Sequence, residues 1–246
     1  MPGRKPPVRV LITAEHASWR VPGAYQALFV GSEAVLESHR AWDPGTRQLA
    51  RDLSSALNVP LLEGKVTRLL VDLNRSRNHR GHLSEFSRTL SVDDRARLID
   101  RYWQPHWNAF RAAIEQAPGQ LIHVACHSFS PVLNGNRRNA DIGLLYDPSR
   151  KEEKLWCQQL AQVITEHLPA LNVRMNYPYR GVSNGMGQQH RRMFDADRLL
   201  TMELEINSAL VTSPDWVEIR QGLIAAIGQA LLMTSNRHEF ENYAEV

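Results

Sequence analysis

The chain has 246 residues, enough for one large domain with a sizeable core, and no linker-like stretch divides it. The net charge is only +3 and the basic residues are scattered, which argues against nucleic acid as a partner. Two cysteines give no basis for a disulfide framework. We expect a cytoplasmic protein without a membrane partner, because neither a signal-peptide pattern nor a membrane-spanning stretch is present. Nothing in the sequence specifies an oligomeric state.

Apolar runs rich in β-forming residues alternate with helical patterns along the chain. Asp43-Pro44 has the form of a helix N-cap followed by proline at the first helical position. Pro105 should kink or divide the helical pattern in which it lies. In chain order, we expect strands at 9–13, 61–62, 69–73, 121–125, 141–146 and 199–206, and helices at 32–39, from Asp43 to Leu57, and at 92–115, 151–168 and 216–232. Loops are expected at 75–87, 130–138 and 176–190.

Alternating strands and helices are typical of α/β proteins. The apolar runs at 9–13 and 121–125 are continuous, as expected of central parallel strands that are covered on both faces. We therefore predict a single α/β domain over residues 8–235, with tails at 1–7 and 236–246. Its central sheet should be mostly parallel or mixed, with helices on both faces.

Two of the predicted strands end in a histidine that is followed by small or polar residues. VLITAEHAS carries His16, and LIHVACHSFSP carries His127. Ligands bind at the carboxyl ends of strands in open α/β sheets, so both imidazoles should lie at the same edge. One histidine in such a place is more often a structural hydrogen-bonding residue. The matching pair favours a metal site or an acid–base site.

A catalytic zinc ion needs about three protein ligands and one open position. The third ligand should be a carboxylate or another histidine. Glu15 is adjacent to His16, and Asp43 follows one short predicted helix later. Asp43 has an alternative role as a helix cap, because Pro44 follows it directly. From the residues alone, both acidic side chains remain candidates.

The segment TMELEIN, at 201–207, places two carboxylates on a predicted buried strand. Alternate residues of a strand share a face, so Glu203 and Glu205 lie together, opposite the apolar residues between them. Buried carboxylates are unfavourable unless they are paired or bind a ligand, whereas an edge strand with a wet face is the ordinary alternative. Glu205 lies nearer the carboxyl end and is the better candidate for a general base that activates water.

Other nucleophiles fit the sequence less well. Cys126 directly precedes His127, and alternation along the strand places the two side chains on opposite faces, so they cannot readily form a thiolate–imidazole pair. Ser18 and Ser128 do not lie in a G-x-S-x-G elbow. A Walker loop, a dinucleotide-binding fingerprint and an H-E-x-x-H helix are also missing from the sequence, which excludes several enzyme classes.

Several arginines lie in the segments that flank these candidates. Arginine binds carboxylates through paired hydrogen bonds, so an anionic substrate is expected. Any one of these arginines, taken alone, is more often an ordinary surface residue. They are Arg68, Arg75, Arg137, Arg138 and Arg180.

Short motifs follow one another along the chain from Val10 to Leu210. In order, they are AEHAS with VP shortly after it, WDPGTRQLA, RLLVDLNR, HSFSP, DIGLLYD, NYPYRG and ELEIN. Their ordered succession resembles the N-formylglutamate amidohydrolase family. That family looks related to zinc carboxypeptidases and aspartoacylase. The resemblance implies a phosphorylase/hydrolase-like α/β fold and zinc, or another divalent metal, as the cofactor.

By this resemblance, His16 and His127 match the two histidine ligands of the metal. Asp43 is the expected third ligand, in preference to Glu15, because the aspartate is the residue that appears in the formylglutamate enzymes. Glu205 resembles the catalytic glutamate that would take a proton from water and pass it to the leaving amine.

The resemblance also implies how the substrate is held. Asn74 and Arg75 resemble the Asn-Arg pair that binds a substrate carboxylate, and we add Arg138 and Arg180 as further substrate-binding candidates. Arg68, or the metal itself, would stabilise the oxyanion of the tetrahedral intermediate.

Three positions depart from the related enzymes. Zinc carboxypeptidases carry a glutamate ligand three residues after the first histidine, where this chain has Trp19. The formylglutamate enzymes usually have proline before that histidine and arginine after the Glu-Ile of the late strand. This chain has Glu15 and Asn207 instead.

The expected reaction is hydrolysis of the linear amide bond of a small anionic N-acyl amino acid, with N-formylglutamate giving formate and glutamate. One alternative is a metal-dependent amidase or carboxypeptidase-like enzyme that acts on another N-acyl amino acid or a peptide. The other is a binding protein that has kept the fold and lost the chemistry.

Overall fold

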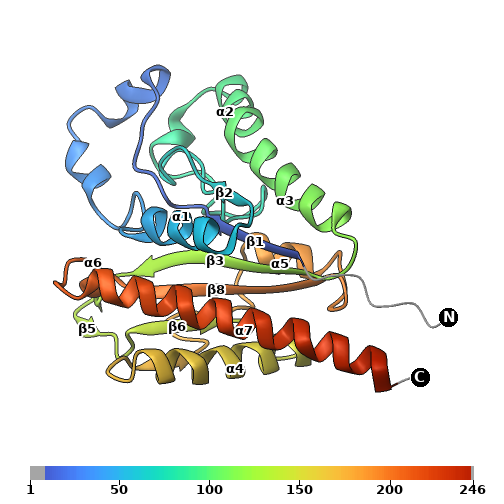
Figure 1. Ribbon diagram of the computed structural model, residues 1–246. Helices are drawn as coiled ribbons and strands as arrows, with labels where there is room; N and C mark the ends of the chain where they lie inside the picture. Colours follow the sequence, from blue (N-terminus) through green and yellow to red (C-terminus); the bar gives the residue numbers. More distant parts are fainter. Residues whose placement is uncertain (1–8, 245–246) are drawn as a thin grey trace.

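The computed structural model describes the backbone of residues 9–244 and the side chains of residues 9–234. Its centre is a six-stranded sheet with the order β2-β1-β3-β8-β6-β7 (Figure 1). Neighbouring strands are parallel, except that β6 runs antiparallel to β8, so the predicted mixed sheet is confirmed. The strands are β1 (Arg9–Ala14), β2 (Leu61–Glu63), β3 (Leu121–Phe129), β6 (Ile142–Leu145), β7 (Val173–Met175) and β8 (Leu199–Asn207), and a hairpin pairs β4 (Val132–Leu133) with β5 (Asn136–Arg137).

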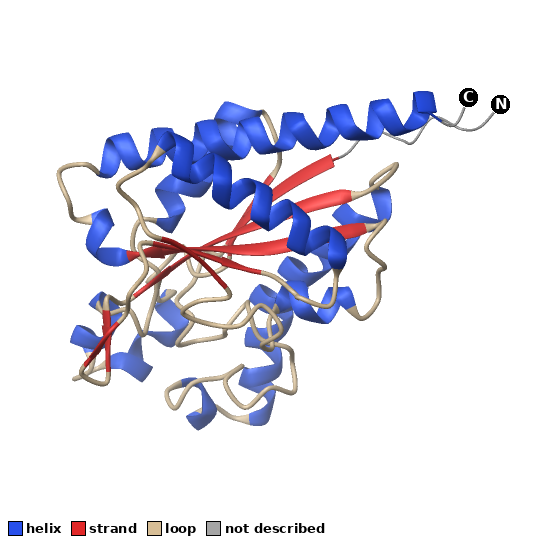
Figure 2. Ribbon diagram, turned by 90° about the horizontal axis from the view of Figure 1, so that it is seen from below, coloured by secondary structure: helices blue, strands red, loops and turns tan. Residues whose placement is uncertain are grey.

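Helices cover both faces of the sheet, as predicted (Figure 2). Residues of α1, α4 and α7 pack on one face, and residues of α3 and α5 pack on the other. None of the helices in the described part of the chain combines the length and the apolar character needed to span a membrane. The α-helices are α1 (Thr46–Leu57), α2 (Val92–Leu98), α3 (Gln104–Gln116), α4 (Lys151–His167), α5 (Met186–Arg191), α6 (Ser208–Val211) and α7 (Trp216–Ala244). Three 3₁₀ turns, η1 (Gly23–Phe29), η2 (Glu33–Glu37) and η3 (Ser87–Thr89), and the π-helical segment η4 (Ile99–Trp103) complete the elements.

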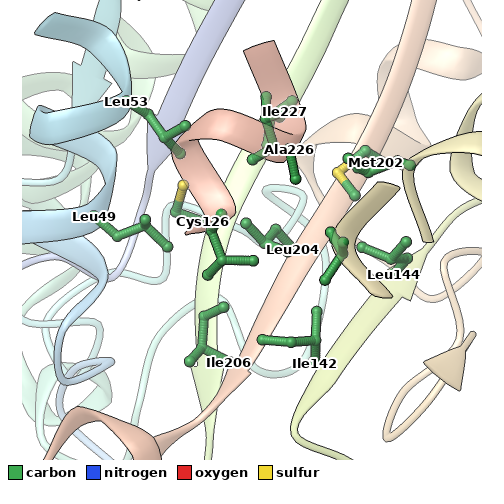
Figure 3. Close-up of a cluster of buried hydrophobic side chains, with 14 of the residues drawn as sticks. Leu49, Leu53, Cys126, Ile142, Leu144, Met202, Leu204, Ile206, Ala226 and Ile227 are labelled. Carbon is green, nitrogen blue, oxygen red and sulfur yellow. The ribbon is translucent and has the colours of Figure 1, made fainter. Parts of the chain in front are cut away.

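The two faces of the central strands differ in chemistry because side chains alternate along each strand. On one face, Cys126, Met202, Leu204 and Ile206 belong to a buried apolar cluster together with side chains of α1 and α7 (Figure 3). Burial also raises the pKa of the Cys126 thiol, as expected of a core cysteine. The other face begins with apolar residues and becomes polar toward the carboxyl ends of β3 and β8, where His123, His127, Thr201, Glu203 and Glu205 lie.

The prediction of a strand at 69–73 is wrong, because this segment packs in a second apolar cluster outside the sheet. Leu69, Leu70, Val71 and Leu73 are buried against α2 and the π-helical segment rather than in the sheet. The backbone there is a series of turns, in which the amide of Leu70 donates to the carbonyl of Thr67. The sequence pattern detected burial correctly, but a short apolar run does not distinguish a buried strand from a buried loop.

The predicted start of the first long helix is also wrong. Helix α1 begins at Thr46, and its N-cap is Gly45 in the left-handed conformation, with φ of 79°. The Thr46 hydroxyl donates to the backbone carbonyl of Asp43, which leaves the Asp43 carboxylate free to point elsewhere. Asp43 therefore precedes the helix without capping it through its side chain.

Other element boundaries differ in informative ways. The helical pattern at 92–115 is divided, as Pro105 predicts, and the division takes the form of the π-helical segment just before the proline. Strand β3 continues to Phe129, so His127 lies inside the strand. The segment expected to be a loop at 176–190 contains the start of α5. Strand β7 was not predicted. The helix expected at 32–39 is only the 3₁₀ turn η2. Helix α7 continues through Ala244, and the expected tail at 1–7 lies outside the described residues.

A buried ion pair fixes the segment that leads into α5. Glu153 of α4 is fully buried and accepts hydrogen bonds from Arg191 Nε at 3.0 Å and from Arg150 at 3.3 Å. Arg191 also donates to the carbonyls of Gly181, at 2.6 Å, and Thr201, at 2.8 Å. One guanidinium thus joins α4, β8 and the loop that precedes α5.

We expect Arg191→Ala to lower the free energy of unfolding by about 3 kcal/mol, because it removes a main partner of a buried carboxylate. Chemical denaturation of the two proteins measures this difference. Arg192→Ala is the matched control, since Arg192 is exposed, and it should change stability by less than about 0.5 kcal/mol. Equal effects of the two substitutions would contradict the role given to Arg191.

Candidate active site

Two adjacent strands bring His16 and His127 together. His16 follows the end of β1, and His127 lies near the end of β3, which pairs with β1 in parallel. Their ring centroids are 5.0 Å apart, and both side chains are buried. The expected convergence of the two imidazoles at the carboxyl edge of the sheet is present in the structure.

Asp43 completes a group of three side chains that is able to hold a metal ion. Asp43 Oδ2 lies 3.3 Å from His16 Nδ1 and 3.0 Å from His127 Nδ1. One ligand atom from each of the three residues falls within 4.8 Å of the others. Two imidazoles and one carboxylate form a donor set that suits a divalent cation such as zinc. The residues present therefore fit the metal that the sequence resemblance implies.

The second nitrogen of each imidazole contacts another carboxylate. His16 Nε2 lies 2.7 Å from Asp72 Oδ1, and His127 Nε2 lies 3.1 Å from Glu15 Oε2. Glu15 is thus placed behind the His127 ring, on the side away from Asp43. This geometry favours Asp43 over Glu15 as the residue that would complete a metal site.

Neighbouring charges control the ionisation of Asp43. Burial alone would raise its pKa, but the charges of His16 and Arg68 and the hydrogen bond from His127 outweigh burial and hold the pKa well below its usual range. Arg68 NH1 lies 3.1 Å from Asp43 Oδ1, and Arg68 NH2 lies 3.4 Å from Asp72. Asp43 is consequently an ionised acceptor, as a metal ligand must be.

Glu205 faces the same cavity from the neighbouring strand. It is paired in register with His127, so the two side chains leave the same face of the sheet. Burial raises the pKa of Glu205 to about 8, with a further increase from the carboxylates of Asp43 and Glu203 and an opposing effect of His127. Glu205 Oε2 is buried and lacks a hydrogen-bond partner among the described residues, which leaves that atom available to a water molecule or a ligand.

Gly143 of β6 makes room for Glu205. The two residues are opposite each other in the antiparallel pair of β6 and β8. A Cβ atom on Gly143 would lie 2.0 Å from the carbonyl oxygen of Tyr177 and 3.2 Å from the Cβ of Glu205. Only glycine fits between these two segments without displacing the wall of the cavity.

The raised pKa of Glu205 predicts a pH dependence of stability. Its folded-state pKa of about 8 is above the ordinary value of 4.5, so its contribution to stability is complete below about pH 4.5 and is lost as the pH rises through about 8. Glutamine resembles the protonated acid and does not ionise. We therefore expect metal-free Glu205→Gln to become more stable than metal-free wild type between about pH 6 and about pH 9, by several degrees in Tm.

Thermal unfolding of the two chelator-treated proteins across this pH range tests the expectation. The difference in Tm between variant and wild type should be small at the lower pH and grow toward the higher pH. A difference that stays constant with pH would contradict a raised pKa of Glu205.

The cavity in front of these groups has a volume of about 200 Å³. Arg75 and Arg180 both line it. Arg75 donates to the backbone carbonyls of Asn74 and Asn184, at 2.8 and 2.7 Å, which fixes the direction of its guanidinium. The remaining lining residues are His16, Asp43, Arg68, Asn74, His127, Ser128, Tyr179, Ser183, Asn184, Glu203 and Glu205.

Two of the flanking arginines lie outside this lining. The Arg138 guanidinium is 4.8 Å from the ring centroid of Tyr179 and 5.7 Å from that of Phe129. Arg138 thus packs against Tyr179, which lines the cavity, but does not line the cavity itself. Arg137 lies on the exposed strand β5 of the hairpin.

Several residues of the site were not selected from the sequence. Asp72 belongs to the DLNR stretch that contains Asn74 and Arg75, so its position two residues before Asn74 was an available signal. Tyr179 and Asn184 lie in the expected loop at 176–190, whose sequence gives no sign of which side chains point inward. Their places depend on tertiary contacts such as that between Arg191 and Gly181.

Known proteins are similar to this chain over almost its whole length. A sequence model of the N-formylglutamate amidohydrolase family matches residues 8–212. The crystal structure of gene product Atu2144 from Agrobacterium tumefaciens is 27% identical with a TM-score of 0.74, and the match covers 92% of this chain and 91% of that one. N-formylglutamate amidohydrolase from Ralstonia eutropha JMP134 is 17% identical with a TM-score of 0.62 over 96% of each chain, which is a similarity of fold. Comparison with curated proteins gives no match.

The chain is a single α/β domain with a mixed central sheet, and buried imidazoles and carboxylates lie at the carboxyl ends of its central strands. The chain belongs to the N-formylglutamate amidohydrolase family, whose sequence model covers most of its length. The family resemblance noted in the sequence is confirmed by this match.

Proposed function

We propose that this protein is a metal-dependent amidohydrolase, with zinc or another divalent cation, that cleaves the amide bond of a small anionic N-acyl amino acid. N-formylglutamate, which would yield formate and glutamate, is the substrate that family membership favours. The observation that carries the proposal is the convergence of His16, His127 and Asp43 on one point beside Glu205.

His16, His127 and Asp43 would hold the metal through Nδ1, Nδ1 and Oδ2. A divalent cation bound there supplies Lewis acidity, which polarises an amide carbonyl and makes a water molecule more acidic. Arg68 lies beside Asp43 and lines the cavity, so its charge is available to the oxyanion that develops on the carbonyl oxygen.

Glu205 would act as the general base and then as the general acid. Its free oxygen, Oε2, would accept a proton from the attacking water and return it to the amide nitrogen as the C–N bond breaks. A general base works best when its pKa lies near the operating pH. Burial raises the pKa of Glu205 to about 8 in the cation-free cavity, and the charge of a bound cation would lower that pKa and favour the ionised carboxylate that this role needs.

Arg75 and Arg180 would bind the carboxylates of the substrate. They lie in the cavity lining with Asn74, whose Oδ1 accepts from the backbone amide of Met186 at 2.7 Å and whose Nδ2 lies 3.4 Å from His127 Nε2. Paired hydrogen bonds from arginine to carboxylate provide both affinity and orientation. Two arginines suit a dicarboxylate such as an N-acylglutamate.

Asn207 favours a second candidate, an amidohydrolase for a different N-acyl amino acid. The related formylglutamate enzymes usually carry arginine at this position. Here the Asn207 side chain caps α6 by accepting from the amide of Ala209, and it donates to the carbonyl of Ala140. Asn207 is thus committed to the fold and does not supply a cationic group to the substrate.

Kinetics of the zinc-loaded protein with a panel of N-acyl amino acids test these alternatives. N-formylglutamate should have the highest kcat/KM, and N-formylglutamine, which lacks the side-chain carboxylate, should be about 10- to 100-fold poorer. A preference for N-acetyl or N-succinyl substrates would support the second candidate. Binding of N-acyl amino acids without release of amine from any of them would overturn the proposal in favour of a binding protein.

A further inference from the structure

Glu15 contacts the ring nitrogen of His127 that points away from Asp43. Its Oε2 lies 3.1 Å from His127 Nε2, whereas Nδ1 of the same ring lies 3.0 Å from Asp43. Asn74 Nδ2 also approaches Nε2, at 3.4 Å, but an amide NH₂ and a ring N–H are both donors. An ionised carboxylate only accepts, so the shorter contact is an ion-pair contact between His127 Nε2 and Glu15 Oε2, an oxygen that has no hydrogen-bond partner among the described residues.

A directed chain of hydrogen bonds holds the other oxygen of Glu15. Thr13 Oγ1 donates to Glu15 Oε1 at 2.6 Å, so the same hydroxyl must accept from His123 Nε2, at 2.8 Å. His123 Nδ1 then accepts the proton of the Thr201 hydroxyl, at 2.7 Å. Thr201, His123 and Thr13 each donate one proton, Glu15 only accepts, and all four side chains are buried.

The chain runs across three neighbouring strands on the polar face of the sheet. Thr13 lies on β1, His123 on β3 and Thr201 on β8, and the last two are paired in register. Burial lowers the pKa of His123 to about 3, so its ring is neutral and carries a single N–H. The direction of donation therefore leads from Thr201 toward Glu15 without an unpaired donor.

We propose that Glu15, held in place by Thr13, His123 and Thr201, is a positioning residue that keeps His127 Nε2 as a donor and leaves Nδ1 as the coordinating atom. A carboxylate on the second nitrogen of a ligand imidazole fixes the orientation of the ring and raises its basicity. This inference rests on the proposed metal site.

Zinc affinity, measured by competition with a chelator at constant pH, tests the inference directly. Glu15→Gln preserves the size of the side chain but replaces one of its two acceptor oxygens with an NH₂ donor. That NH₂ group must then face another donor, either His127 Nε2 or the Thr13 hydroxyl. We expect its zinc affinity to fall about 10- to 100-fold. Glu205→Gln is the matched control, because it makes the same chemical change to a buried carboxylate of the same site and should keep the affinity of wild type.

Thr13→Val provides a second variant that removes only the hydroxyl in the middle of the chain. It should weaken zinc binding by a smaller factor than Glu15→Gln does, while thermal unfolding confirms that the metal-free variants fold. Wild-type zinc affinity in folded Glu15→Gln or in folded Thr13→Val would overturn the inference. Absence of zinc binding by the wild-type protein would instead overturn the proposed function, so the two failures are distinguishable.

Discussion

Replacing His127 with alanine is expected to abolish metal binding and amide hydrolysis together. His127 is one of the three proposed ligands among the described residues, and its ring lies between the carboxylates of Asp43 and Glu15. Without it, two side chains remain to hold the cation, and two buried carboxylates lose their shared partner. The loss of zinc affinity should exceed the roughly 100-fold that follows removal of a hydrogen-bond partner of a ligand.

Metal analysis and activity assays of purified His127→Ala and wild-type protein measure these effects. His190→Ala is a suitable control, because His190 is also a buried histidine but packs against Trp107 and Phe110 outside the cavity. The control should retain the metal content of wild type even where its stability is lower. Retention of stoichiometric metal by His127→Ala would contradict the assignment of His127 as a ligand.

Glu205→Gln is expected to separate metal binding from turnover. Glutamine keeps the shape of the side chain but cannot accept a proton from water, so kcat should fall by about 100- to 10,000-fold. Metal content and KM should stay close to those of wild type, because Glu205 is not one of the three proposed ligands. Steady-state kinetics and metal analysis on the same preparation check both halves of this expectation.

The control for this variant is the other carboxylate on the same strand face. Glu203→Gln changes a neighbouring side chain that also lines the cavity but lies farther from the carboxyl end of β8. It should reduce kcat much less than Glu205→Gln does. Equal losses of kcat in the two variants, or loss of metal in Glu205→Gln, would contradict the role of general base.

The architecture and the convergence of the two imidazoles followed from the sequence because both depend on regular periodicity. Continuous apolar runs marked the central strands, and a histidine at the end of each located the edge of the sheet where they meet. Alternation along 201–207 placed Glu203 and Glu205 on one face correctly, since a strand has a fixed period of two.

The sequence was less informative where long-range contacts override local patterns. Asp43-Pro44 has the residue pattern of a helix N-cap, but helix α1 begins only at Thr46. The Asp43 carboxylate instead contacts His16, His127 and Arg68. The apolar run at 69–73 is buried in a second cluster and has no neighbouring strand to pair with. Glu15 was visible as an unusual neighbour of His16, but its contact with His127 depends on the pairing of β1 with β3.

The central claim is that one divalent cation is held by His16, Asp43 and His127 and faces Glu205. Anomalous scattering from crystals of the zinc-loaded protein, recorded at the zinc absorption edge, tests it most directly. We predict one strong peak about 2.0–2.2 Å from Nδ1 of both histidines and from an Asp43 carboxylate oxygen. A peak bound instead by Glu15 or Asp72, or no peak between the two imidazoles, would contradict the account.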